Sequence, residues 1–151
     1  MTAVGMFAKM HDQPLFQTND GRVLYKAETD RHHILWRRAW YTSSYEKRIR
    51  ESSGFVLRMS VVAHRDLHAN VEPPQKPNHH LLRGLHQYSR ELDIHDPYQK
   101  FYAMAEFLGK IASKDGPNAN EASLLQDNFQ QQIAFVESGK LQPYEDRNDT
   151  I

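Results

Sequence analysis

Two histidines four residues apart, His64 and His68, have the spacing that most directly suggests chemistry in this chain of 151 residues. Side chains four residues apart lie on one face of a helix, so both imidazoles can reach a single metal ion. The His-x-x-x-His pattern also arises by chance in many helices. A metal site therefore requires a further ligand from elsewhere in the chain.

A second pair, His32 and His33, stands at the start of an apolar segment. Neighbouring residues of a strand point to opposite faces, so one of the two can bind a metal ion while the other faces a substrate. One ligand from this pair, added to His64 and His68, gives a three-histidine site with open coordination positions, which is typical of a catalytic ion. The sequence leaves open which member of the pair is the ligand.

Short strands and helices are predicted to position these histidines. In chain order they are a strand at 22–27, a strand or irregular segment at 33–41, a helix from Ser43 or Ser44 to about Glu51, a strand at 55–62 and a helix at 63–70. The serine hydroxyl can accept a hydrogen bond from a free amide of the first helical turn. The run at 55–62 is rich in β-branched residues, which favour strands, and it leads directly into the helix that carries His64 and His68.

The pattern changes to helices after a Pro-rich stretch at 71–77. Apolar residues then recur at intervals of three and four, which predicts three amphipathic helices with one apolar face each. Asp96-Pro97 opens the second helix, and Gly139 closes the third. We therefore expect an irregular arm at 1–21, a core at 22–77, a helical region at 78–138 and a polar tail at 139–151.

Composition excludes several classes of protein. The chain has no cysteine, which rules out a disulfide scaffold and a cysteine-ligated zinc site. It has no apolar run near the roughly 18 residues that a membrane span needs. The first ten residues do not have the apolar stretch of a signal peptide. We expect a cytoplasmic protein with no membrane partner.

The charge is balanced overall but unevenly placed. Lys plus Arg and Asp plus Glu both total 19. Residues 22–68 contain 10 basic and 5 acidic side chains, a net +5, whereas residues 69–151 contain 8 basic and 12 acidic ones, a net −4. Such asymmetry favours an anionic partner for the basic half.

The ordered set of His32-His33, a strand and His64-x-x-x-His68 resembles the ββα-metal (HNH) nucleases, most closely the colicin-type nuclease branch. The fragment Ser60-Val-Val-Ala-His64-Arg-Asp-Leu-His68 is similar in kind to the closing motif of that branch. The chain is also similar to small phage and prophage proteins of HNH type, in which a Pro-rich segment follows the helix. The resemblance covers residues 22–77 and implies an α+β protein: a ββα-metal core followed by a three-helix C-terminal region.

The resemblance implies a role for each histidine. His33 would be the general base that takes a proton from the attacking water, and His32, His64 and His68 would hold a divalent ion, Mg²⁺, Mn²⁺, Ni²⁺ or Zn²⁺. The roles of His32 and His33 could be exchanged. Asp66 is either a carboxylate that orients a ligand imidazole or an ordinary solvated helix residue.

DNA is the partner that the resemblance implies. Basic side chains of the first half could hold its phosphate backbone, namely Arg31, Arg37, Arg38, Lys47, Arg48 and Arg50. The family's middle asparagine has no counterpart, since no Asn lies between Thr29 and Ala69. Glu51 and Ser53 fall in its neighbourhood, and the sequence does not choose between them.

Two functions from different classes follow. The first is a metal-dependent DNA endonuclease or nickase of HNH type, encoded by a phage or prophage. The second is a non-catalytic scaffold whose helical half binds a protein partner, DNA or another copy of the chain. The missing asparagine, the zero net charge and the acidic helical half favour the second.

Overall fold

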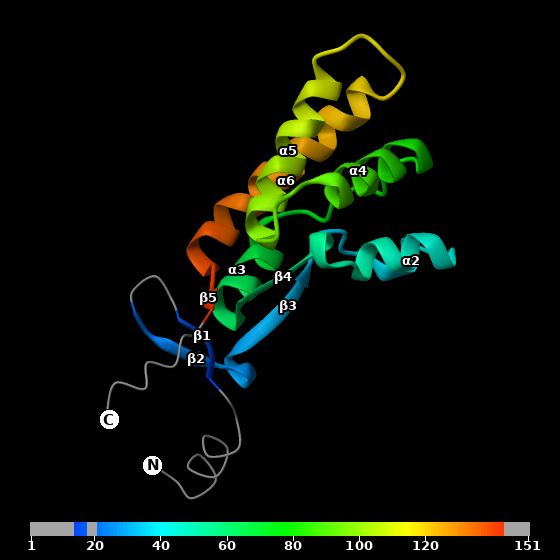
Figure 1. Ribbon diagram of the computed structural model, residues 1–151. Coiled ribbons are helices and arrows are strands. Elements are labelled where there is room, and N and C mark those ends of the chain that lie inside the picture. The colour runs from blue at the N-terminus through cyan, green and yellow to red at the C-terminus, as the bar shows by residue number, and fades with distance from the viewer. Residues whose placement is uncertain (1–13, 18–20, 144–151) are drawn as a thin grey trace, which may run out of the picture.

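A computed structural model describes residues 14–17 and 21–143, with side chains described for 21–141. The chain is of mixed α+β type (Figure 1). Two small antiparallel sheets lie beside a group of five α-helices in this described part. One sheet has the order β2-β1-β5, from Val23–Tyr25, Pro14–Gln17 and Gln142–Pro143, and the other pairs β3, Thr29–His33, with β4, Val56–Ser60. No helix in the described ranges is both long and apolar enough to cross a bilayer.

The strand that carries His32 and His33 begins earlier than the sequence suggests. β3 spans Thr29–His33. It pairs antiparallel with β4, with Thr29 opposite Ser60 at one end and His33 opposite Val56 at the other. The following residues, Ile34 and Leu35, are both fully buried, so the chain does not alternate there and leaves the strand. The segment to Tyr41 is irregular and includes a short 3₁₀ turn.

Side-chain caps define the starts of the helices. α2, Ser44–Glu51, begins after Ser43, whose Oγ accepts from the amide of Glu46. β4 ends at Ser60, whose Oγ accepts from the amide of Ala63, so α3, Val61–Asn70, follows the strand with no loop. The direct passage from β4 to α3 fixes where His64 and His68 point relative to β3.

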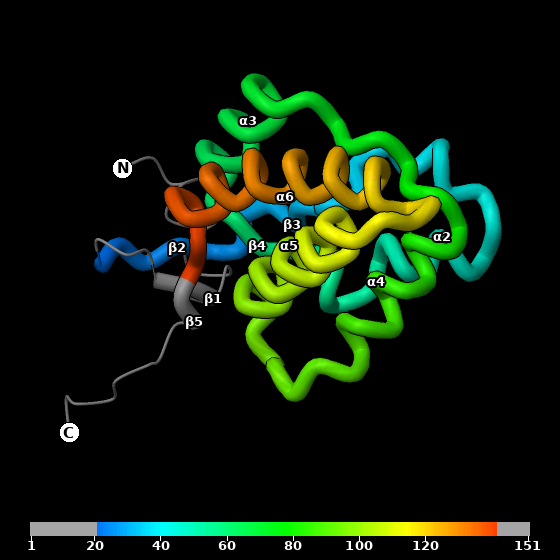
Figure 2. Tube along the Cα trace, turned by 90° about the horizontal axis from the view of Figure 1, so that it is seen from above, coloured from blue at the N-terminus to red at the C-terminus, as the bar shows by residue number. Residues whose placement is uncertain are grey.

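Three further helices follow the Pro-rich segment. α4 spans His79–Glu91, α5 spans Pro97–Ala112 and α6 spans Ala119–Gly139. Figures 1 and 2 show α5 and α6 side by side, and the view from above places α6 across β3 and β4 with α3 along its other side. The three helices expected from the periodicity are therefore present, and α6 packs directly onto the elements that carry the histidines.

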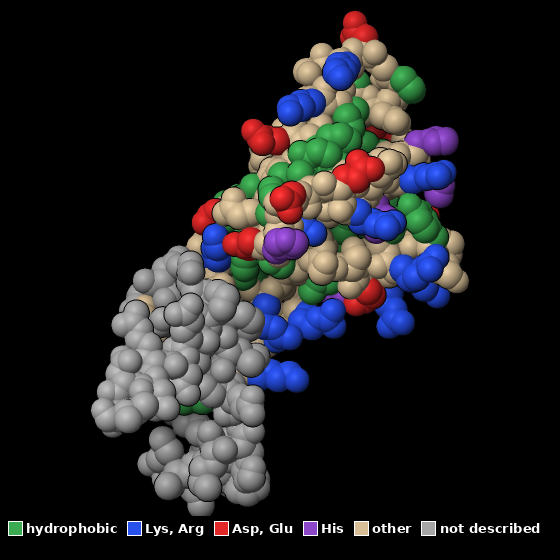
Figure 3. Space-filling model, in the orientation of Figure 1, with side chains coloured by type: hydrophobic (Ala, Val, Ile, Leu, Met, Phe, Trp, Pro, Cys, Tyr) green, Lys and Arg blue, Asp and Glu red, His purple; other side chains and the backbone are tan. Residues whose placement is uncertain are grey.

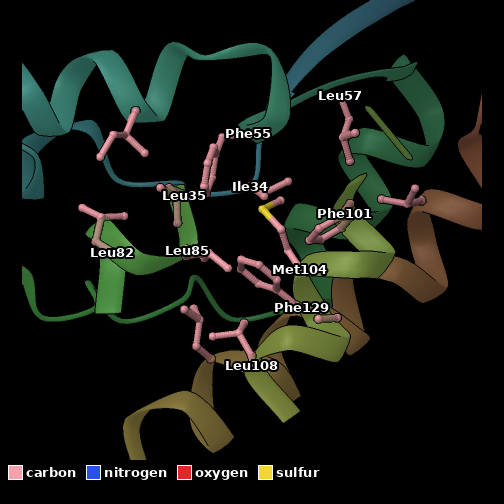
Figure 4. Close-up of a cluster of buried hydrophobic side chains, with 14 of the residues drawn as sticks. Ile34, Leu35, Phe55, Leu57, Leu82, Leu85, Phe101, Met104, Leu108 and Phe129 are labelled. Carbon is pink, nitrogen blue, oxygen red and sulfur yellow. The ribbon is translucent and has the colours of Figure 1, made fainter. Parts of the chain in front are cut away.

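One hydrophobic cluster joins the two halves of the chain. Buried side chains from before the Pro-rich segment, such as Ile34 and Phe55, pack with buried side chains from the helical region, such as Phe101 and Phe129 (Figure 4). Burial of large apolar side chains in one continuous core makes the helices part of the same folding unit as the small sheet.

The two ends of the chain differ from the expected arm and tail. Residues 14–17 pair as β1, and residues 142–143 pair with them as β5. Leu141 is buried, and Lys140 forms an isolated bridge with Met59 of β4. The rest of the expected arm and tail, 1–13, 18–20 and 144–151, lies outside the described residues.

Candidate metal centre

Three of the four sequence-predicted histidines come together in the structure. One imidazole nitrogen from each of His32, His64 and His68 lies within 4.8 Å of the other two. His32 comes from β3, and His64 and His68 project from one face of α3. The antiparallel pairing of β3 with β4 and the loop-free start of α3 bring these elements into contact.

The three nitrogens converge at distances that suit a shared ion. Nδ1 of His32 lies 3.1 Å from Nε2 of His64, and Nε2 of His68 lies 3.0 Å from the same atom. Two nitrogens bound to one tetrahedral zinc at 2.0–2.1 Å are about 3.3 Å apart. Both measured distances are close to that spacing, and all three nitrogens lie within 4.8 Å of one another, so the cluster can accept a transition-metal ion.

Hydrogen bonds fix the tautomer of His64. Its Nδ1 lies 3.0 Å from Oδ2 of Asp30, a carboxylate that can only accept. Nδ1 of His64 therefore carries the hydrogen, and Nε2 presents a lone pair toward the cluster. A carboxylate behind a ligand imidazole orients the ring and increases its basicity, as outer partners in metal sites do.

Gln132 of α6 fixes the tautomer of His32. Its amide nitrogen donates to the carbonyl of Ile34 and to Oδ1 of Asn128, so the amide oxygen must accept from Nε2 of His32, at 2.8 Å. Asn128 is itself oriented by donating to the carbonyl of Glu72. Nδ1 of His32 is consequently the ring atom without a hydrogen.

Two lone pairs thus face each other at 3.1 Å, between Nδ1 of His32 and Nε2 of His64. Such a pair repels unless a proton or a cation lies between the two atoms. His32 is fully buried, and burial, together with neighbouring histidines, lowers its pKa to about 3. A neutral imidazole is the form that binds a metal ion. The donor set therefore fits a bound ion.

His68 lies on the exposed side of the cluster. Its ring packs against Trp36 with centroids 4.1 Å apart, and its pKa is lowered by partial burial and then by His64. Because His32 is sealed by α6 and His68 is exposed, any free coordination position opens toward solvent on the His68 side. An open site of this kind is typical of a catalytic ion rather than a structural one.

His33 lies outside the cluster. Its Nε2 is 3.0 Å from Oε2 of Glu51, at the end of α2. The hydrogen bond from His33 is the largest cause of a lowered pKa of the Glu51 carboxyl, and Arg50 and Arg31 add to it. Of Glu51 and Ser53, between which the sequence does not choose, the structure brings Glu51 to His33, whereas Ser53 is exposed.

The predicted basic residues divide into two groups. Arg31, Arg37, Arg38, Lys47 and Arg48 are exposed. Arg50 is half-buried, and its guanidinium donates to the carbonyls of Leu35 and Trp36 and to Glu51. Arg50 therefore holds the segment after β3 against α2, and the exposed group remains accessible to phosphates.

Asp66 is exposed, and its carboxylate has no imidazole partner among the described residues. Asp30 of β3 occupies the place behind His64 that the sequence interpretation considered for Asp66. A residue two positions before His32 on the same strand shares its face, so strand alternation supplies a signal for Asp30 once β3 is known.

Gln132 is the residue of the site that sequence reasoning missed. The buried positions of α6 are Ala122, Leu125, Phe129, Gln132, Val136 and Gly139. Their spacing of three and four residues continues through Gln132. A glutamine at a core position of an otherwise apolar stripe marks Gln132 as a buried polar residue, but it does not identify His32 as its partner.

Comparison of the chain with protein-family models, curated proteins and solved structures finds no match. The functional argument therefore depends on the geometry of the site.

Proposed function

We propose that this chain is a metal-dependent DNA endonuclease or nickase whose β3, β4 and α3 form a ββα-metal core of HNH type. The observation that carries the proposal is the convergence of three imidazole nitrogens, two of them with fixed lone pairs, on one point at the surface. The order of strand, strand and helix around that point supports it.

The donor set favours some ions over others. Three imidazoles suit zinc or nickel, whereas magnesium prefers oxygen ligands. An ion held by His32, His64 and His68 would supply Lewis-acid stabilisation of negative charge on the scissile phosphate and the leaving oxygen.

His33 is suited to the role of general base. With Nε2 donating to Glu51, its Nδ1 is free to accept a proton from a water molecule. The carboxylate of Glu51 stabilises the imidazolium that forms, in the way that an acidic residue supports a catalytic histidine. Arg31, 3.7 Å from the same carboxylate, helps to keep Glu51 ionised.

The test is a plasmid-nicking assay on metal-stripped protein, with Mg²⁺, Mn²⁺, Ni²⁺ and Zn²⁺ added singly. Three variants are compared: His33→Ala, His64→Ala and the control His95→Ala, whose side chain is 97% exposed. We expect His64→Ala to lose both ion binding and nicking, His33→Ala to lose nicking but bind the ion, and His95→Ala to retain both.

Two results would contradict the proposal. Nicking that is equal in all three variants would belong to a contaminating enzyme. A folded protein that binds an ion but does not nick DNA with any of the four ions would instead support the non-catalytic scaffold. The absence of the family's asparagine is the observation that favours this second function.

A further inference from the structure

A second polar site lies between α2 and α4, and none of the three clustered histidines lines it. It is a hollow of about 680 Å³. Tyr45 of α2 forms one side, and residues of α4 form the other, among them His79, Arg83, His86, Arg90 and Glu91. Four of these five α4 side chains are basic.

The basic side chains occupy one face of α4. Positions 79, 83, 86 and 90 are separated by four, three and four residues, which places them in one stripe along the helix. Arg83 and Arg90 carry the positive charge of this face, whereas burial and then Arg90 lower the pKa of His86. Neither Arg83 nor Arg90 has an ion-pair partner among the described residues. The carboxylate of Glu91 accepts a hydrogen bond from Gln87. The stripe is therefore suited to an anion from outside the chain.

Aromatic packing holds the stripe in place. The ring of Tyr45 lies 6.0 Å from that of His79 and 5.9 Å from that of His86, and His86 also lies 6.3 Å from the buried Phe55. These contacts fix α4 against α2. The exposed guanidinium groups of Arg83 and Arg90 are thus presented from a rigid helix, and guanidinium groups recognise phosphate oxygens by paired hydrogen bonds.

We propose that this hollow binds backbone phosphates of the DNA that is cleaved at the histidine cluster. The inference rests on the proposed function and extends the contact with DNA from α2 to α4. α2 links the two places, since Glu51 contacts His33 and Tyr45 lies six residues earlier. Six helical residues span about 9 Å, which is roughly three nucleotide steps along one strand.

Charge along the intervening surface agrees with this path. Lys47 and Arg48 of α2 are exposed. Figure 3 shows Lys, Arg and His side chains gathered on the flank that carries α2 and α4. A strand that leaves the cluster along α2 therefore meets basic side chains up to the hollow.

The experiment measures binding of a short labelled DNA duplex to the full chain in EDTA, where metal-dependent cleavage does not interfere. The double variant Arg83→Ala/Arg90→Ala is compared with Lys110→Ala/Lys114→Ala, which removes the same charge from exposed positions at the far end of α5. The logarithm of the DNA-binding constant falls linearly with the logarithm of the salt concentration, and each lost phosphate contact makes this slope shallower by about 0.9. We expect affinity about 10-fold weaker or more at 50 mM salt and a slope shallower by about 1.8 for the arginine variant only.

Circular dichroism and ion binding equal to those of the unchanged chain confirm that the arginine variant is folded. Equal weakening in both double variants would assign the effect to overall charge and overturn the inference. If Arg83→Ala/Arg90→Ala weakens binding of inorganic phosphate but leaves duplex binding unchanged, the inference is overturned in favour of a small-anion site. Either result leaves ion-dependent nicking, the test of the proposed function, unaffected.

Discussion

Replacing Gln132 by methionine tests whether α6 prepares His32 to bind an ion. Methionine has a similar length and can fill the buried space, but it removes the acceptor for His32 and the donor to the carbonyl of Ile34. The ring of His32 then has no partner that holds Nε2–H on the far side of the cluster. Loss of such an outer partner typically weakens metal binding 10–100-fold.

The same change affects stability by a separate route. It leaves the buried N–H of His32 and the carbonyl of Ile34 without partners, and each unsatisfied buried group costs about 1–3 kcal/mol. Two such groups give about 2–6 kcal/mol, which for a chain of this size lowers Tm by about 4–24 °C.

The assay is a titration with Zn²⁺ against a chromophoric chelator, at a temperature where circular dichroism shows both proteins folded. Gln130→Met is the matched control, because Gln130 is exposed on the same helix two residues away. Wild-type zinc affinity in folded Gln132→Met would refute the reasoning that Gln132 sets the tautomer of His32.

Four further outcomes are expected. Removing the ion with a chelator should lower Tm, because an ion at 100 times its Kd stabilises the folded state by about 2.7 kcal/mol, and a chelator-insensitive Tm would count against the site. In metal-stripped protein, stability should fall as the pH drops below 6.5, because burial lowers the pKa of His32 to about 3 and the unfolded chain takes up the proton first. The free energy of unfolding should fall by about 1.4 kcal/mol per pH unit toward pH 3. Urea unfolding between about pH 7 and pH 5 measures this decline, which should be shallower in His32→Gln. Gly139→Ala should destabilise by about 1–3 kcal/mol, since its Cβ would lie 2.3 Å from that of Ala63 across the contact of α6 with α3. Gly84→Ala, which meets no atom within 4 Å inside α4, should instead stabilise by about 0.5–1 kcal/mol in the same unfolding measurement.

The features that could be predicted from sequence are the local ones. Helix caps such as Ser43 and Asp96, the apolar stripes and the shared face of His64 and His68 all depend on residues within a few positions of each other. The sequence leaves strand or irregular structure open for 33–41 and predicts no strand at 29–33, because Thr29–His33 is mostly charged and polar. The strand conformation of β3 comes from pairing with β4, which overrides the weak intrinsic preference of these residues.

The hydrogen-bond partners of the clustered histidines could not be predicted in the same way. Asp30 lies 34 positions from His64, and Gln132 lies 100 positions from His32. Such pairs form only when the sheet, α3 and α6 pack together, so no local pattern specifies them.

The position of Gln132 changes the role of the helical half. The sequence predicts a core at 22–77 and a helical region at 78–138. α6 instead seals the buried side of His32, orients its ring, and shares the hydrophobic cluster with β4 and α3. The segment 22–77 contains all three clustered histidines but not the residue that sets the tautomer of one of them. A fragment ending at residue 77 would therefore expose Ile34 and Leu57 to water and leave His32 without its acceptor, so the histidine cluster and the helices that orient it form one folding unit.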